Sequence, residues 1–167
     1  DNEMGILVKG VAGGNTVEYF STDSTVIEES GIARGDIIRV GVDSNGYITK
    51  VQKIYNADES NLYGALLAPN DGVCENTSSF DSQFRVVIGT VDSISDNYMR
   101  FTMRKLSNGQ FYDDPSICRV SGPTVIKYET DNSNAVPSVC SVNDIIRGDK
   151  IIVRMSLADA KEIIILR

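Results

Sequence analysis

Hydrophobic and polar residues alternate one by one over several stretches of the chain, a pattern that predicts half-buried antiparallel β-strands. In residues 98–104, Met99, Phe101 and Met103 fall on one face, and the residues between them fall on the other. Residues 36–42 alternate in the same way. The three apolar side chains on one face of that second stretch are Ile38, Val40 and Val42. Further strands are expected at residues 47–55 and 160–166.

Two Asn-Gly pairs mark tight turns between these strands, because both residue types tolerate the positive φ that a short hairpin needs. Asn45-Gly46 follows the strand at residues 36–42. Asn108-Gly109 stands between residues 98–104 and Phe111-Tyr112. The second pair predicts a hairpin over Tyr98–Val120.

No stretch carries an apolar stripe over three helical turns, so only short helical turns are expected, at Glu28–Ala33 and Val142–Arg147. Ser141 is the predicted N-cap of the second turn, with Asp144 three residues later. Gly148 is its predicted C-terminal stop.

One segment occurs twice, which indicates an internal repeat. Arg34–Val40 recurs as Arg147–Val153, and each copy starts with Arg-Gly-Asp. The likeness extends upstream in two further pairs of segments, Thr16–Tyr19 with Thr124–Tyr128 and Val8–Val11 with Ile88–Val91. The predicted hairpin Tyr98–Val120 is extra to the second copy. The chain therefore divides into a first β unit at residues 1–56 and a second at residues 86–167.

Residues 57–85 join the two units and are rich in Asn, Asp, Ser and Gly. A structureless connector of this length is unusual in a compact domain. Two interpretations stand side by side: the connector folds over one unit, or it contributes a strand to the shorter first unit.

An all-β fold of two small antiparallel β-barrels in tandem, five or six strands each, is the predicted architecture. A flat sheet of that size buries one face poorly and leaves two open edges. Closing it into a barrel covers the inner face and removes the edges.

Composition excludes several function classes. The 167 residues include 23 acidic and 16 basic side chains, a net charge of −7, which argues against nucleic-acid binding. Histidine is absent, so Ser-His and Cys-His nucleophile pairs and His-ligated metal sites are excluded. We expect no catalytic residues, no cofactor and no metal site, and the binding residues are not identified by the sequence.

We expect neither a membrane span nor a targeting signal from the residues at the two ends of this sequence. Asp1–Met4 lacks the features of a signal peptide, and the apolar run Ile163–Leu166 is too short to span a membrane. That run predicts a buried final strand. We expect a piece of a longer protein, with no membrane insertion.

Three cysteines, Cys74, Cys118 and Cys140, are an odd number at wide spacing and do not fit a thiolate metal site. A Cys118–Cys140 disulfide and free buried thiols are both compatible with the sequence.

Several motifs suggest chemistry, but each has a simpler structural explanation. The two Arg-Gly-Asp tripeptides match an integrin-type adhesion ligand, yet each Asp leads directly into a predicted buried strand. Asx-rich groups match calcium ligands, but they are also ordinary turn residues. The Asx-rich groups are Asp43-Ser44-Asn45, Asp92 with Asp96-Asn97, and Asp131-Asn132 with Asn134. Asp113-Asp114 is a carboxylate pair, but neighbouring strand residues point to opposite faces.

Tyrosines accompany most of the predicted strands, and small barrels use aromatic faces to bind oligosaccharides. Half-buried strand tyrosines are the simpler interpretation. The tyrosines concerned are Tyr19, Tyr47, Tyr55, Tyr98, Tyr112 and Tyr128.

The segments Ile32–Val40 and Asn45–Ile48, with Val51, and the second copy Arg147–Val153, resemble strands of β-barrel modules in Firmicute cell-envelope proteins. Such modules often share a chain with surface-layer homology repeats. The second copy departs from the pattern, because Ser156–Asp159 replaces the Asn-Gly turn. The resemblance implies a non-catalytic, extracellular or cell-surface piece of a modular protein, and it supplies no functional residues.

We therefore expect a non-catalytic structural or interaction module of a secreted or cell-wall-associated protein. Its expected partners are other domains of the parent chain or cell-wall polymers. The alternative is a carbohydrate-binding module that uses exposed tyrosines on a barrel face. A glycosidase that uses carboxylates alone is a third hypothesis, and it needs two facing carboxyl groups in a cleft.

Overall fold

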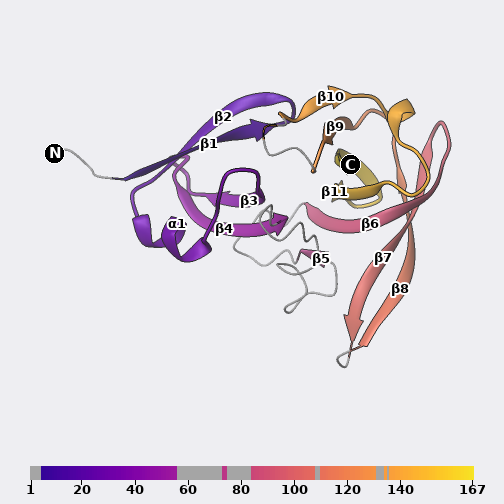
Figure 1. Ribbon diagram of the computed structural model, residues 1–167, viewed down its shortest axis with the longest axis horizontal. Coiled ribbons are helices and arrows are strands. Elements are labelled where there is room, and N and C mark those ends of the chain that lie inside the picture. Colours follow the sequence, from indigo (N-terminus) through magenta and orange to yellow (C-terminus); the bar gives the residue numbers. More distant parts are fainter. Residues whose placement is uncertain (1–4, 56–72, 75–83, 108–109, 131–133, 135) are drawn as a thin grey trace.

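The computed structural model describes residues 5–55, 73–74, 84–107, 110–130, 134 and 136–167, and these residues are mostly β (Figure 1). We call residues 5–55 the N-terminal unit and residues 84–167 the C-terminal unit. The N-terminal unit holds the strands β1 (Ile6–Ala12), β2 (Asn15–Ser21), β3 (Ile37–Val42) and β4 (Ile48–Tyr55), and the helix α1 (Ser24–Ser30). The C-terminal unit holds β6 (Arg85–Ile94), β7 (Tyr98–Ser107), β8 (Gln110–Arg119), β9 (Thr124–Tyr128), β10 (Ser138–Cys140), the 3-10 turn η1 (Val142–Asp144), β11 (Lys150–Ser156) and β12 (Asp159–Leu166).

Two hairpins build the N-terminal unit. β1 and β2 pair antiparallel around Gly13-Gly14, both of which have positive φ (58° and 82°), as a two-residue hairpin turn requires. β3 and β4 pair antiparallel around the Asn45-Gly46 turn, where Gly46 has a φ of 83°. A single parallel bridge, Phe20 with Tyr47, joins the hairpins. The predicted strand pair and its Asn-Gly turn are confirmed.

A seven-strand mixed sheet in the order β10-β9-β12-β11-β6-β7-β8 builds the C-terminal unit. β9 and β12 run parallel, and the other neighbours along this path run antiparallel. The sheet curls until β8 meets β12 at one residue pair, Arg119 with Asp159. The result is a partial ring.

The described residues do not show two tandem barrels. The C-terminal ring closes through a single residue pair between β8 and β12. In the N-terminal unit, β3 pairs only with β4 and β1 only with β2, so no ring exists among the residues described there. The prediction of two barrels assumed that every edge strand would pair with another strand of its own unit. The structure instead covers part of the exposed apolar surface by packing the two units against each other.

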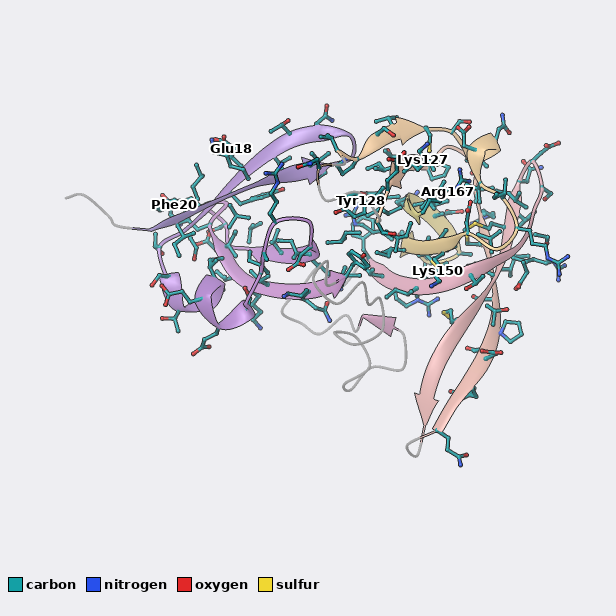
Figure 2. All side chains as sticks on the ribbon, in the orientation of Figure 1. Glu18, Phe20, Lys127, Tyr128, Lys150 and Arg167 are labelled. Carbon is teal, nitrogen blue, oxygen red and sulfur yellow. The ribbon has the colours of Figure 1, made fainter. Side chains whose placement is uncertain are left out.

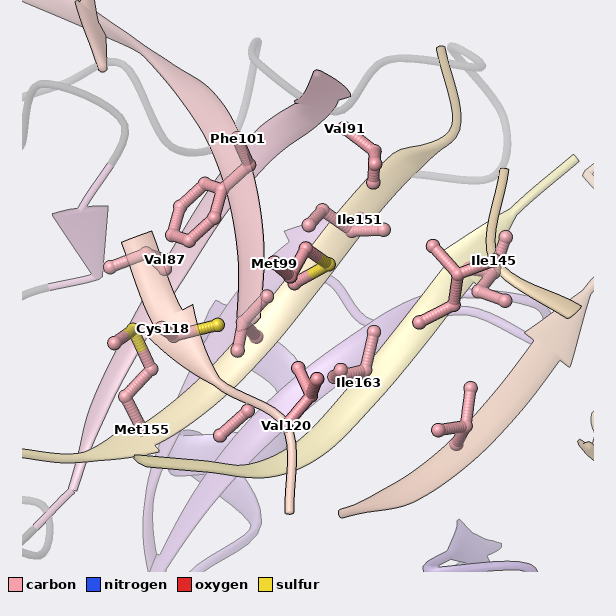
Figure 3. Packing of buried hydrophobic residues seen from close by; sticks show 14 of the residues in the cluster. Val87, Val91, Met99, Phe101, Cys118, Val120, Ile145, Ile151, Met155 and Ile163 are labelled. Carbon is pink, nitrogen blue, oxygen red and sulfur yellow. The ribbon is translucent and has the colours of Figure 1, made fainter. Parts of the chain in front are cut away.

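The interior of the partial ring is the main hydrophobic core. β7 contributes Met99, Phe101 and Met103, which are 0%, 0% and 4% exposed, so the predicted alternation in this strand is confirmed. Arg100, between two of them, is exposed. Met99, Phe101 and Met103 belong to one cluster with side chains of the other ring strands and with Ile145, which follows η1. Figure 3 shows Met99 and Phe101 within this cluster. Each fully buried aliphatic side chain contributes about 1.5 to 3 kcal/mol.

A second hydrophobic cluster lies between the two units. Ile54 and Tyr55 of β4 pack there with residues of the C-terminal unit. Those C-terminal residues are Val86, Ile88, Tyr128, Ile152 and Leu166. β6, β11 and β12 are thus buried on both faces, one toward the ring interior and one toward the N-terminal unit. This explains why they read as continuous apolar runs, Ile163–Leu166 among them.

The helical turns lie near their predicted positions, with two corrections. α1 spans Ser24–Ser30 and not Glu28–Ala33, because Asp23 caps its N-terminus and Gly31, with a φ of 60°, ends it. The second turn covers only Val142–Asp144.

The predicted capping box at the second turn is confirmed. The Ser141 hydroxyl accepts the Asn143 N–H, and the Asp144 carboxylate accepts the Ser141 N–H. Its C-cap is Ile145, not the predicted Gly148. Gly148, with a φ of 91°, instead forms the turn into β11.

The connector contributes one described strand, β5 (Val73–Cys74), which pairs antiparallel with Val87 and Val86 of β6. This pairing is with the C-terminal unit and not with the shorter first unit. The rest of residues 57–83 lies outside the described residues, as does the Asn108-Gly109 turn.

The extra hairpin of the second copy is confirmed as β7 and β8, which pair over their full length. It projects from the body of the molecule (Figure 1). Among the described strands, none pairs with the outer edge of β8 before Arg119, and Pro115 lies on β8 opposite Thr102. Proline suits an edge strand, because it has no N–H to donate.

Candidate functional site

The two Arg-Gly-Asp segments form the same local structure, which we call the carboxylate turn. In the second copy, the Asp149 carboxylate accepts the Ile146 N–H at 2.9 Å, and the Asp149 N–H donates to the Ile146 carbonyl at 3.2 Å. Arg167 donates to the same carboxylate from Nε at 3.0 Å and from Nη2 at 2.9 Å. Hydrogen bonding to Asp149 raises the pKa of the Arg167 guanidinium.

The first copy has the same arrangement, with one cation contact to the carboxylate instead of two. The Asp36 carboxylate accepts the Ala33 N–H at 2.9 Å, and the Asp36 N–H donates to the Ala33 carbonyl at 3.2 Å. The ammonium of Lys53 lies 3.1 Å from the Asp36 carboxylate. Lys53 stands near the end of β4, and Arg167 directly after β12, the matching strand.

The correspondence includes a second acceptor. Lys53 also donates to the carbonyl of Gly31 at 2.7 Å, and Arg167 also donates to the carbonyl of Asp144 at 2.6 Å. Each carbonyl belongs to the end of the short helical segment before the turn. In both units, therefore, one cation joins the helical turn, the carboxylate turn and the final strand of a hairpin.

Burial assigns the Arg-Gly-Asp segments a structural role. The side chains of Asp36 and Asp149 are only 1% and 5% exposed. Gly35 and Gly148 have φ angles of 95° and 91°, which glycine adopts without strain. An adhesion ligand needs an accessible carboxylate, so the structural interpretation of these segments is confirmed.

Tyr128 connects the first carboxylate turn to the C-terminal unit. Its hydroxyl donates to the carbonyl of Gly35 at 2.9 Å, and its ring meets Tyr55 edge to face at 6.3 Å between centroids. Figure 2 shows Tyr128 on the side of the C-terminal unit that faces the N-terminal hairpins. Burial, with smaller contributions from Tyr55 and Asp36, raises the pKa of Tyr128.

A second contact between the units involves Glu162 of β12. Its carboxylate accepts a hydrogen bond from the backbone of Gly13, at the β1–β2 turn. Burial raises the pKa of Glu162, while Arg154 and the Gly13 hydrogen bond oppose that shift. The turn of the first hairpin thus reaches the sheet of the C-terminal unit.

The acidic groups that resemble calcium ligands serve turns and strand contacts where the structure describes them. Asp43 accepts the N–H groups of Asn45 and Tyr47, which is ordinary Asx-turn chemistry. Asp92 accepts the Thr102 hydroxyl at 2.7 Å. Asp131 and Asn132 lie outside the described residues. Across the described part of the chain, no group of three or more Cys, Asp or Glu side chains is arranged to hold a metal ion.

The carboxylate pair Asp113-Asp114 lies on β8 opposite Arg104 and Met103, respectively. Neighbouring residues of a strand face opposite sides of the sheet, so these two carboxyl groups do not converge on one substrate. The predicted divergence is confirmed.

Cys118 and Cys140 are free thiols, which decides between the two interpretations of this pair. Cys118 is 1% exposed in the main core, and burial, with a smaller contribution from Asp159, raises its pKa to about 11. Burial also raises the pKa of Cys140. Such thiols are poor nucleophiles at neutral pH.

The tyrosines do not form one exposed face. Tyr55 and Tyr128 are buried at 3% and 9% exposure. Tyr47 packs edge to face on Phe20, with ring centroids 5.7 Å apart. Tyr98 and Tyr112 are exposed, but their register in the β7–β8 hairpin puts them on opposite faces of it.

Sequence reasoning missed the cations of the carboxylate turns. Lys53 and Arg167 stand far along the chain from Asp36 and Asp149, and only the hairpin register brings each pair together. A signal was present, since both repeated segments are followed by a strand that ends close to a basic residue.

No protein-family model, curated protein or solved structure matches the chain. The resemblance to cell-envelope modules stays a prediction. Within the described ranges, no helix has the length and apolar character needed to cross a membrane.

Proposed function

We propose that the chain is a non-catalytic structural or interaction module of a modular secreted or cell-wall-associated protein. The observation that carries this proposal is the duplicated carboxylate turn. The two buried carboxylates, Asp36 and Asp149, each receive a backbone N–H and a cation. Groups that could serve acid–base chemistry are engaged in holding strands and turns together.

The contact between the units supports the same role. Their shared hydrophobic cluster and the Tyr128–Gly35 hydrogen bond couple the N-terminal hairpins to the C-terminal sheet. Because the two units share a core, they are expected to keep a fixed placement relative to each other and to behave as one rigid body. This property suits a spacer or a docking platform between other domains of a parent chain.

The tandem-barrel arrangement belongs to this proposal. In this proposal the partial ring of the C-terminal unit, whose β8 and β12 meet at one residue pair, would be one of the two barrels. The N-terminal unit would become comparable only if the open edge of β3 received a further strand.

A carbohydrate-binding role is the weaker alternative. It requires several aromatic rings on one face, and the exposed Tyr98 and Tyr112 lie on opposite faces of their hairpin.

The test uses the purified chain with insoluble cell-wall polysaccharide. We expect no release of soluble sugar and a single cooperative unfolding transition in denaturant. Turnover that scales with protein concentration would overturn the non-catalytic role. Binding to the polymer that is lost in Tyr98→Ala or Tyr112→Ala would instead support the carbohydrate-binding alternative.

A further inference from the structure

The two units share a four-strand arrangement. In the C-terminal unit, the strands β10-β9-β12-β11 are related as antiparallel, parallel and antiparallel neighbours. In the N-terminal unit, β1-β2-β4-β3 show the same sequence of relations, with the Phe20–Tyr47 bridge as the parallel step. The repeated segments make β3 the counterpart of β11 and β4 the counterpart of β12.

The two units differ at the outer edge of the last strand in this arrangement, which is β11 in one unit and β3 in the other. β11 pairs with β6 along its other edge, over residues 150–155. β3 pairs only with β4 among the strands that the structure describes. Among the described residues, therefore, no strand of the N-terminal unit lies at the edge where the C-terminal unit has β6.

The strand whose sequence matches β6 is β1. Val8–Val11 resembles Ile88–Val91, yet β1 pairs with β2 and not with β3. Strand direction explains this. The hairpin pairings and the parallel bridge make β1 and β3 of one chain run the same way, whereas β6 and β11 are antiparallel. Within one chain, β1 therefore cannot pair with β3 as β6 pairs with β11, whereas the β1 of another copy can approach in that direction.

We propose that β1 of one copy adds antiparallel to the open edge of β3 in a second copy of this chain. The register of β6 on β11, carried over through the repeat, puts Leu7 opposite Val40 and Lys9 opposite Ile38. This assembly goes beyond the proposed module role, because strand addition needs no wall polymer and no parent domain.

The sides to which the backbone N–H groups of β1 point agree with this register. Ala12 and Asn15 flank a two-residue turn, so this pair exchanges hydrogen bonds inside the hairpin. N–H groups alternate sides along a strand, so those of Leu7, Lys9 and Val11 point to the open edge. On β6, Val91 exchanges hydrogen bonds with the segment leading into β11, and Val91 is the counterpart of Val11.

The sides to which the backbone N–H groups of β3 point agree with this register as well. The Asp43 N–H donates to the Tyr47 carbonyl at 2.9 Å, toward the β4 side. By alternation, Val42, Val40 and Ile38 direct their N–H groups to the open edge. Val40 and Ile38 are the counterparts of Val153 and Ile151, which lie opposite Val87 and Gly89 of β6.

Exposed apolar side chains lie on the same two strands, β1 and β3. Leu7 and Val11 on β1 are 48% and 39% exposed, and Val42 on β3 is 46% exposed. Lys9, the charge on β1, is paired with Glu18 at 2.7 Å. The open edge of β8, by contrast, carries Pro115, which discourages strand addition.

The first test is sedimentation of the full chain over about a hundredfold range of concentration. We expect copies to associate, and Leu7→Lys and Val42→Lys each to weaken association at least about tenfold. Ile117→Lys is the matched control, since Ile117 is 47% exposed beside the open edge of β8. A chain that stays monomeric, or an equal effect of all three variants, overturns the proposal.

The second test fixes the register. Leu7→Cys and Val40→Cys are combined, because residues opposite each other in a hydrogen-bonded pair have Cα atoms about 5.5 Å apart, within disulfide range. We expect a 7–40 cross-link between isotopically distinct copies, and no such link in the single variants. Slow amide exchange at Val40 in a monomer would assign the β3 edge to a segment of the same chain and overturn the proposal. Polymer binding does not enter either readout, so the two proposals can fail separately.

Discussion

The guanidinium of Arg167 holds the buried carboxylate of Asp149 through two hydrogen bonds, at 3.0 Å from Nε and 2.9 Å from Nη2. Lys53 holds Asp36 in the equivalent place, as a single ammonium at 3.1 Å. The geometry is conserved between the units although the cation differs. The carboxylate is thus the fixed part of the repeat, and its partner is the part that has varied.

Asp149→Asn should destabilise the chain by about 2 kcal/mol, because it leaves Arg167 without its charge partner. The effect stays below that of a fully buried pair, since the Arg167 side chain is 35% exposed and screened by solvent. Urea unfolding followed by circular dichroism measures the change. Asp159→Asn breaks the more exposed pair with Arg119 and should cost less than about 1 kcal/mol. Equal losses in both variants would contradict a structural role specific to the carboxylate turn.

Tyr128→Phe should cost about 1 kcal/mol, because it removes the hydrogen bond to the Gly35 carbonyl and keeps the ring beside Tyr55. The loss should appear in the single unfolding transition of both units. Tyr98→Phe, at a 48% exposed position, is the control and should change stability by less than about 0.5 kcal/mol. A separate early transition in Tyr128→Phe would contradict this expectation, because the shared hydrophobic cluster should still couple the two units.

Local chemistry made most of the strands predictable. The alternation around Phe101 and the Asn45-Gly46 turn involve residues close in sequence, so the pattern alone contains the information. The capping box at Ser141 is local in the same sense. α1 begins and ends earlier than the predicted turn at residues 28–33, because Asp23 caps its N-terminus and Gly31 ends it.

Long-range relations were not predictable. The parallel pairing of β9 with β12 joins segments separated by β10 and β11, and nothing in either segment specifies its neighbour. The cations Lys53 and Arg167 were missed for the same reason. Continuous apolar runs such as Ile163–Leu166 did indicate burial, but they could not show that one face would pack against the other unit.

Stability should fall between about pH 9 and pH 11 because of Cys118. Its pKa is 9.0 in an ordinary setting and about 11 in the folded chain, since burial disfavours the thiolate. The unfolded chain therefore loses its proton first as pH rises, which favours unfolding over that range. Cys118→Ala, compared with the parent chain by urea unfolding at pH 8 and pH 10.5, should reduce the dependence on pH. Mass-resolved thiol labelling at pH 8 should modify Cys140 well before Cys118, and the reverse order would contradict the burial argument.

Gly89→Ala should destabilise the chain by about 1 to 3 kcal/mol through overpacking. A Cβ at Gly89 would lie 2.8 Å from the Phe101 ring and 2.8 Å from the Thr102 carbonyl oxygen. Gly10→Ala on β1 is the matched control, because a Cβ there meets no atom within 4 Å. Thermal unfolding of both variants distinguishes crowding from the general effect of replacing a strand glycine. A loss at Gly10 as large as at Gly89 would rule out crowding as the cause.

Leu157→Gly should stabilise the chain by about 0.5 to 1 kcal/mol, because relief of backbone strain exceeds the added freedom of the unfolded chain. Leu157 has a φ of 53° at the tip of the β11–β12 hairpin, where the side chain is 92% exposed. Removing that side chain therefore forfeits little packing. Ala158→Gly tests the neighbouring turn position, whose φ is not positive, and should destabilise by about 0.5 kcal/mol. Urea unfolding of both variants gives the comparison, and a loss of stability in Leu157→Gly would mean that the leucine makes contacts that outweigh its strain.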